Sequence, residues 1–172
     1  MANRKKVVIL DEDMFNIYEF RYPSYRLKEA GVEVTVVGSG RKSQFSGKPA
    51  TEIAVDANAD DVSAVDFDGI IIPGGYAPDM MRRSPSMVKL VADFDKAGKL
   101  VAAICHAGWM LASADVLKGR NVTSFFAIKD DMVNAGADWQ DSAVVVDRNL
   151  VTSRTPDDLP VFMPAILEVL EK

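Results

Sequence analysis

The chain has 172 residues, of which 48% are hydrophobic and 26% are charged, and its formal net charge is −5. This balance is typical of one globular domain over residues 1–172 with a sizeable core. The negative charge argues against nonspecific binding to nucleic acid and against docking on anionic membranes.

The chain contains one cysteine, Cys105, and one histidine, His106. A single cysteine excludes an internal disulfide, and two such residues are too few for a zinc site of several Cys or His ligands. We therefore expect neither a metal nor a cofactor, and we expect a reducing cytoplasm as the setting. The apolar run at residues 7–10 is too short for a signal peptide or a membrane span.

Strands and helices are expected to alternate in the first half of the chain. The patterns predict a strand at 6–10, a helix at 15–30, a strand at 32–37, a polar loop or hairpin at 41–49, and a buried strand from 67 into a turn at 73–75. Pro23 should kink the first helix or break its first turn, because proline lacks the amide donor.

The second half continues the alternation. The patterns predict a helix at 85–97, a strand at 100–104, a helix ending near 118, a strand at 121–124, a helix at 128–135, strands at 142–146 and 149–153, and a terminal helix at 157–172. Strand cores such as 70–72 have no polar face, which indicates an α/β fold whose mostly parallel sheet is covered on both sides. Sites in such sheets form where strands end, here at 11–13, 73–75 and 105–106.

The chemistry is expected at Cys105, where a buried strand bends into a helix. Such a bend is the cysteine form of the strand–nucleophile–helix elbow. A thiol above a helix N-terminus should ionise more readily than a free thiol, because the unpaired amides and the dipole favour an anion. The alternative is a buried structural cysteine.

Two glycines and two acids are candidate partners of this thiol. Gly74 and Gly75 leave their backbone N–H groups open to a ligand, and with the N–H of His106 they are candidate oxyanion donors; otherwise the pair only makes a tight turn. Asp79 is a candidate to orient the imidazole, or only an acid that favours a helix dipole.

Glu19 lies among aromatic residues at helical spacing. A carboxyl group on an apolar face would have a raised pKa and could share a proton with a nearby thiol, whereas a solvated helix acid is the alternative. The aromatic stripe itself is expected to belong to the core. Its members are Phe15, Tyr18, Tyr22 and Tyr25.

Five ordered motifs are far more specific than a lone Gly-rich turn. They cover residues 19–23 with 26–31, 72–79, 103–106, 128–136, and 151–154 with 156–159. In these motifs the sequence resembles the DJ-1/PfpI superfamily, and within it the PfpI-like intracellular protease branch. The resemblance implies a flavodoxin-like three-layer sandwich with Cys105 as nucleophile, His106 beside it and Glu19 against the thiol.

The resemblance also implies an oligomer. In the PfpI-like branch the acid that pairs with the histidine comes from a neighbouring subunit, at the position of Asp79, where the branch usually has Glu. Homodimers, and hexamers built as trimers of dimers, would therefore complete the site. His106 should then face outward to the partner, because residues adjacent in sequence point apart.

Three functions follow from these residues. The first is a cysteine hydrolase of peptides or amides, with Cys105 attacking a carbonyl and His106 moving the proton. The second is a glutathione-independent glyoxalase or deglycase acting on small 2-oxoaldehydes such as methylglyoxal, with Glu19 as general acid and base. The third is a redox-sensing or chaperone-like stress protein. A flavin-binding flavodoxin is poorly supported, because the acidic loop 11–13 would repel a phosphate.

Overall fold

Seven strands form the central sheet in the computed structural model, which describes residues 4–172. The order is β10-β11-β7-β6-β1-β2-β5, and every neighbouring pair is parallel except β10 with β11. The strands are β1 (Lys6–Asp11), β2 (Glu33–Gly38), β5 (Ala57–Asn58), β6 (Gly69–Ile72), β7 (Leu100–Ile104), β10 (Val144–Asp147) and β11 (Leu150–Ser153). The predicted α/β fold of the flavodoxin-like type is confirmed.

Two small sheets lie outside the main one. The hairpin of β3 (Gln44–Ser46) and β4 (Glu52–Ala54) is antiparallel, and β8 (Asn121–Val122) pairs in parallel with β9 (Asp138–Trp139). The hairpin confirms the expectation for residues 41–49 and places that segment beside the start of the first helix, through the bridge between Asn16 and Lys48.

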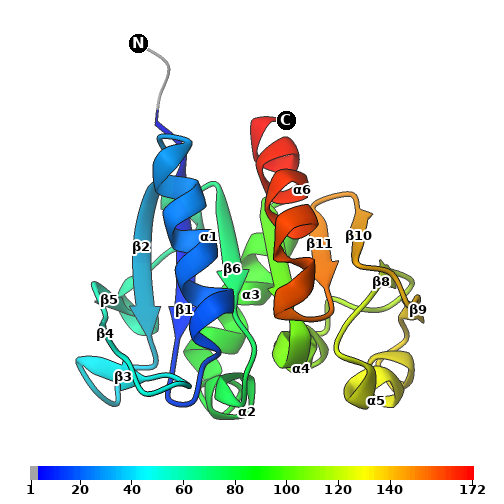
Figure 1. Cartoon of the computed structure of the whole chain (residues 1–172), viewed down its shortest axis with the longest axis horizontal. Helices are drawn as coiled ribbons and strands as arrows, with labels where there is room; N and C mark the ends of the chain where they lie inside the picture. Colours follow the sequence, from blue (N-terminus) through cyan, green and yellow to red (C-terminus); the bar gives the residue numbers. More distant parts are fainter. Residues whose placement is uncertain (1–3) are drawn as a thin grey trace.

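Helices cover both faces of the sheet. They are α1 (Ile17–Glu29), α2 (Ala77–Met81), α3 (Pro85–Lys96), α4 (Gly108–Ser113), α5 (Lys129–Asn134) and α6 (Leu159–Glu171). Figure 1 shows α1 and α6 in front of the sheet and α3 and α4 behind it. Figure 1 shows both chain termini at one end of the sheet and α2 and α4 at the other end, where the parallel strands finish. The termini therefore do not cover the carboxyl ends of these strands, where a site is expected.

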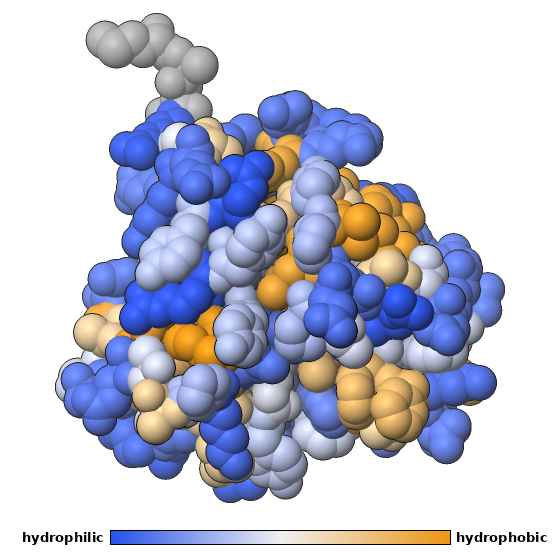
Figure 2. Space-filling view, viewed as in Figure 1, coloured by the Kyte–Doolittle hydropathy of each residue, from blue (hydrophilic) through white to orange (hydrophobic). Residues whose placement is uncertain are grey.

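The middle strands explain the stability of this arrangement. Ile70, Ile71 and Ile72 are fully buried, because helices cover the sheet on both sides. Burying each such side chain contributes about 1.5–3 kcal/mol. The surface is mostly hydrophilic in the view of Figure 2, with hydrophobic side chains gathered over α6 and near α5.

Helix α1 differs from its prediction in two ways. Its first turn is intact although the helix contains Pro23. Asn16 caps this turn, and its side chain accepts a hydrogen bond of 3.0 Å from the backbone N–H of Tyr18. Phe15 is buried, but Tyr18 and Tyr25 are 62% and 55% exposed. The expectation that the aromatic stripe is core is therefore wrong for its tyrosines.

Helix α4 is shorter than predicted. It ends at Ser113 rather than near residue 118, and Asp115 then adopts a positive φ of 56°, which reverses the chain. The apolar residues that suggested a longer helix, Val116 and Leu117, are buried in that turn instead. No helix within residues 4–172 is long and apolar enough to cross a membrane.

Candidate active site

Cys105 sits at a sharp elbow between β7 and α4. Its φ is 61°, a left-handed conformation that is rare for a residue with a side chain and is associated with functional sites. A single turn of 3₁₀-helix, Cys105–Ala107, connects the strand to α4. The elbow is held by a hydrogen bond of 3.2 Å from the backbone N–H of Phe125 to the Cys105 carbonyl. The predicted bend from a buried strand into a helix is confirmed, and the role of Cys105 as a nucleophile stays a prediction.

A cavity of about 480 Å³ opens over this elbow. Its walls include the turn after β6, the start of α1, the β3–β4 hairpin and the segment before α6, and they carry Gly75, Asn16, Lys48, Phe125 and Pro156. Two of the three predicted strand ends, 73–75 and 105–106, therefore meet here.

The third strand end, the acidic loop 11–13, faces elsewhere. Glu12 is buried and pairs with Arg41, and Asp13 accepts a hydrogen bond of 2.6 Å from Lys42. These contacts fasten the β3–β4 hairpin to the end of β1. The loop is thus a structural link to the hairpin. The sequence interpretation did not select Lys48, which lies on the same hairpin and whose backbone is held by separate bonds to the start of α1.

Glu19 is fully buried beneath the thiol. Its Oε2 accepts a hydrogen bond of 2.7 Å from the backbone N–H of Gly74, whereas Oε1 has no hydrogen-bond partner within residues 4–172. Burial raises the pKa of Glu19 to about 7, while the hydrogen bond from Gly74 and the proximity of the Cys105 thiol act in the opposite direction. The expected raised pKa is confirmed, and the alternative of a solvated acid is wrong.

The pKa of Cys105 is opposite to the prediction. Burial, followed by the negative charge of Glu19, raises the pKa of this thiol to about 12, although the backbone N–H groups of His106 and Gly75 lower it. The residue is only 8% exposed, and it opens a short 3₁₀ turn instead of a long helix. Desolvation therefore outweighs the helix dipole, and the expectation of an acidic thiol is wrong.

His106 contacts the thiol directly. Its Nδ1 lies 3.3 Å from Sγ of Cys105, its ring stacks on Phe125 at 4.8 Å between centroids, and it meets the edge of Trp109 at 5.1 Å. Burial lowers the pKa of His106, so the imidazole is neutral at pH 7. The expectation that adjacent side chains point apart is wrong here, because the alternation of a strand ends at the positive φ of Cys105.

The two glycines have different roles. A Cβ on Gly74 would lie 2.6 Å from Oε2 of Glu19 and 2.7 Å from Cβ of Cys105, so the absence of a side chain lets these two groups meet. The N–H of Gly74 is taken by Glu19 and is not free for an oxyanion. The N–H of Gly75 faces the sulfur, and the φ of +74° suits glycine.

Asp79 lies apart from this cluster within one chain. It belongs to α2, and its carboxylate forms an ion pair with Arg83 one turn later. No hydrogen bond or ion pair joins Asp79 to His106 within residues 4–172 of the same chain. A role in orienting His106 in a neighbouring subunit stays a prediction.

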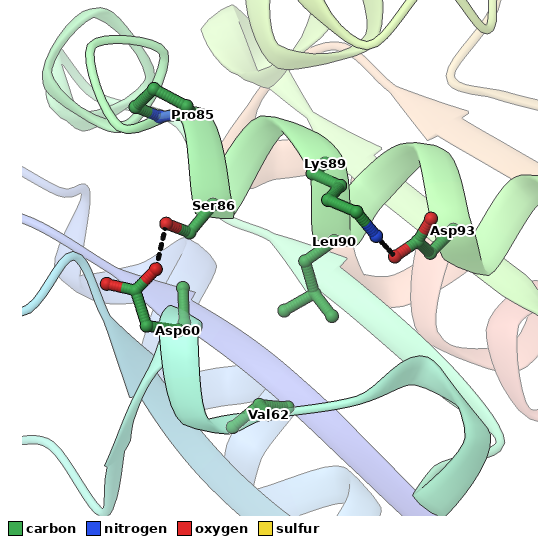
Figure 3. A pocket seen from close by; sticks show the side chains of 8 residues that line it. Asp60, Val62, Pro85, Ser86, Lys89, Leu90 and Asp93 are labelled. Atoms are coloured by element: carbon green, nitrogen blue, oxygen red, sulfur yellow. Dashed lines mark hydrogen bonds and ion pairs between the residues drawn. The ribbon is translucent and has the colours of Figure 1, made fainter.

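A second cavity, of about 370 Å³, lies between α3 and the segment before β6. Figure 3 shows its polar groups bonded to one another, Ser86 to Asp60 and Lys89 to Asp93. Leu90 and Val62 supply its apolar lining. It therefore presents no free reactive group.

Comparisons with known proteins show the family and agree with the fold described above. A sequence model described as the DJ-1/PfpI family matches residues 5–169. Deglycase PfpI of Pyrococcus furiosus is 42% identical over 166 residues, covering 96% of this chain and 99% of that protein. General stress protein 18 of Bacillus subtilis is 43% identical over 170 residues, covering 98% of this chain and 99% of that protein.

One solved structure is similar over nearly the whole chain. It is a two-domain protein of Anabaena variabilis containing DJ-1/ThiJ/PfpI-like and ferritin-like domains, with a TM-score of 0.95 and 46% sequence identity. The match covers 98% of this chain and 48% of that one, so this chain spans about half the length of the two-domain protein.

Proposed function

Because this chain belongs to the DJ-1/PfpI family, we propose that it converts small 2-oxoaldehydes, or the adducts they form with amines, through covalent attack by Cys105. The observation that carries this proposal is the buried Glu19, whose pKa of about 7 matches a general base near neutral pH. Relatives named as deglycases, such as the Pyrococcus furiosus protein, support the same class of chemistry.

The first step follows from the protonation of the pair. At rest Cys105 keeps its proton, because its pKa is raised to about 12. As Sγ bonds to the aldehyde carbon and the C=O double bond opens, Glu19 accepts the thiol proton. The unpartnered Oε1 of Glu19 is the atom available to hold it. General-base help of this kind contributes about 10²–10⁴-fold to a rate.

The oxygen of the attacked carbonyl becomes negative in this step. The backbone N–H groups of Gly75 and His106, which face the sulfur, are placed to donate to it. Glu19 then returns its proton to that oxygen, which gives a neutral hemithioacetal. Neutral His106 is next to the same atoms and can pass a proton between them.

The remaining steps balance without an outside oxidant. Glu19 removes the proton from the former aldehyde carbon, and the electron pair of that C–H bond forms an enediol with the neighbouring ketone carbon. The proton is then returned to the ketone carbon, and the hydroxyl proton on the first carbon moves to the former ketone oxygen. The first carbon is thereby oxidised to a thioester and the second is reduced to an alcohol. Water then cleaves the thioester, which releases lactate and restores the thiol. Methylglyoxal plus water therefore gives lactate.

Lactate formation from methylglyoxal by the purified protein tests this proposal. We expect turnover by the wild type and loss of at least about 10³-fold in Cys105→Ala, since no other nucleophile replaces the sulfur. Conversion that persists in Cys105→Ala, or no conversion by a folded wild type, would contradict the proposal.

A cysteine peptidase or amidase is the second candidate, and the contact of 3.3 Å between His106 Nδ1 and Cys105 Sγ favours it. In this mechanism an acid must hold the imidazole, and Asp79 of a neighbouring subunit would supply it. We rank this function second because Asp79 pairs with Arg83 within the chain and His106 is held by stacking on Phe125.

Peptide-amide cleavage, measured beside the pKa of His106, tests this second candidate. If Asp79 of a second copy contacts His106, Asp79→Ala lowers both the pKa of the imidazole and the cleavage rate. Arg83→Met is the matched control, since it breaks the same ion pair but keeps the carboxylate. An unchanged imidazole pKa in Asp79→Ala would remove the intersubunit triad.

A further inference from the structure

Lys48 lies at the cavity over Cys105 on a segment whose backbone is fixed. The N–H of Lys48 donates to the carbonyl of Phe15 at 2.8 Å, and the N–H of Ile17 donates to the carbonyl of Lys48 at 3.2 Å. These bonds tie the hairpin to the first turn of α1. Lys48 therefore lines the cavity from a backbone position that these bonds define.

The ammonium of Lys48 is available to a ligand. Among residues 4–172, no hydrogen bond or ion pair engages its Nζ. Neighbouring lysine Lys42 behaves differently, because its Nζ is 2.6 Å from Oδ2 of Asp13. The Lys48 side chain is exposed, so a ligand in the cavity would not have to displace an existing partner.

The other described residues that line this cavity carry no formal charge at neutral pH. His106 is neutral because burial lowers its pKa, and Cys105 is protonated because burial raises its pKa. The remaining lining residues, which include Asn16, Tyr76 and Thr155, have uncharged side chains. The described lining of the cavity that contains Cys105 thus carries a single positive group, although the net charge of the chain is −5.

We propose that Lys48 is a specificity-determining residue that binds a carboxylate of the substrate, next to the carbonyl carbon that Cys105 attacks. This inference rests on the proposed function for the identity of the reaction and adds the charge of the substrate. One ammonium matches the single charge of a carboxylate, whereas phosphate sites generally supply arginine or several backbone donors. The preferred substrates are then carbonyl compounds that carry a carboxylate, ahead of neutral methylglyoxal.

Alkylation of Cys105 tests this inference independently of any turnover. Iodoacetate and iodoacetamide have nearly the same shape, but only iodoacetate is charged. In both reactions the sulfur bonds to the CH₂ carbon, iodide leaves, and the thiol proton is released to solvent. Since Cys105 is the only cysteine, the rate of each reagent reports on this site alone. The quantity to compare is the ratio of the iodoacetate rate to the iodoacetamide rate.

We expect Lys48→Met to lower this ratio by about three- to tenfold at low ionic strength, with the iodoacetamide rate unchanged, because one nearby charge is removed. Lys48→Arg should keep the ratio within about twofold of the wild type, because it keeps the positive charge. The difference between Lys48→Met and wild type should shrink in 1 M salt, because the Debye screening length is then only about 3 Å.

Lys42→Met is the matched control, because it removes a neighbouring positive charge that is already paired with Asp13. Its ratio should equal that of the wild type. An unchanged ratio in Lys48→Met, or an equal fall in Lys42→Met, would overturn the role of Lys48. If the ratio falls as expected but methylglyoxal is not converted, the inference about charge stands and only the proposed reaction fails.

Discussion

The cavity over Cys105 and the cavity beside α3 differ in how their polar groups are satisfied. Around the α3 cavity each charged group has a partner, as in the Lys89–Asp93 pair. At the Cys105 cavity the thiol, the Glu19 carboxyl and the Lys48 ammonium lack full pairing. Unpaired groups are costly to bury, and their presence beside an open cavity marks a place kept for a ligand.

Burial also makes the pKa values of the acidic groups at the Cys105 cavity differ from the usual ones. Desolvation raises the pKa of Glu19 to about 7 and that of Cys105 to about 12. Asp60, by contrast, is exposed and Asp93 is half-buried, and each is bonded to a side chain. Substitutions in the two regions should therefore have very different consequences, and the following predictions are ordered from the largest effect to the smallest.

Glu19→Gln should lower turnover of methylglyoxal by about 10²–10⁴-fold, because glutamine cannot accept the thiol proton. The same change in the other cavity, Asp93→Asn, should leave turnover at the wild-type level. The comparison is made with steady-state rates at pH 7. Equal rates for Glu19→Gln and wild type would show that Glu19 is only a structural residue.

Gly74→Ala should lower turnover by about 10²-fold or less, since an added Cβ would lie 2.6 Å from Glu19 Oε2 and 2.7 Å from Cys105 Cβ. The two groups must then separate. Overpacking should also reduce the free energy of unfolding by about 1–3 kcal/mol. Ser86→Ala, at the α3 cavity, is the control for turnover. Full activity in a folded Gly74→Ala variant would contradict the need for contact between Glu19 and Cys105.

Asp11→Asn should change how stability depends on pH. Both oxygens of Asp11 are buried without a hydrogen-bond partner within residues 4–172, and burial raises its pKa to about 8. Because the folded-state pKa is above the unfolded one, its stabilising effect is complete below about pH 4 and is lost as the pH rises through 8.

At pH 8.5 we therefore expect Asp11→Asn to melt about 5 °C or more above the wild type, and the gap should close toward pH 4. Differential scanning calorimetry across this range provides the measurement. Parallel pH curves for the two proteins would show that Asp11 is not protonated in the folded state.

Lys89→Met should have the smallest effect. Its ion pair with Asp93 lies on an exposed face of α3, one helical turn apart, and such pairs contribute about 0.3–0.5 kcal/mol. Chemical denaturation should show a change within that range, with normal turnover. A loss of activity would mean that the α3 cavity also takes part in function.

Much of the fold was predictable because its signals are local. Unbroken apolar runs such as 70–72 identified buried parallel strands, and the bend after residue 104 identified the elbow at Cys105. The limits of α4 were not predictable. The chain reverses at Asp115, which adopts a positive φ, and a single aspartate without a neighbouring glycine or proline is only a weak turn signal.

The site was predictable in membership but not in its electrostatics. Cys105, His106, Glu19 and Gly75 come together as expected, since strand ends meet at one edge of the sheet. The direction in which the thiol pKa shifts depends on how deeply the sulfur is buried and on Glu19, which lies 86 residues earlier in the chain. Lys48 was missed because its place depends on the hairpin packing against α1, which no local pattern reveals.

Whether Cys105 keeps its proton beside Glu19 at neutral pH is tested most directly by titrating the thiol of the folded protein. The thiolate is followed by its ultraviolet absorbance, with Cys105→Ser as the blank. The account predicts that the thiolate of the wild type forms only above about pH 9, and that Glu19→Gln titrates at least one pH unit lower because the negative charge is gone. A wild-type thiolate already complete at pH 7, or identical titrations of the two proteins, would contradict it.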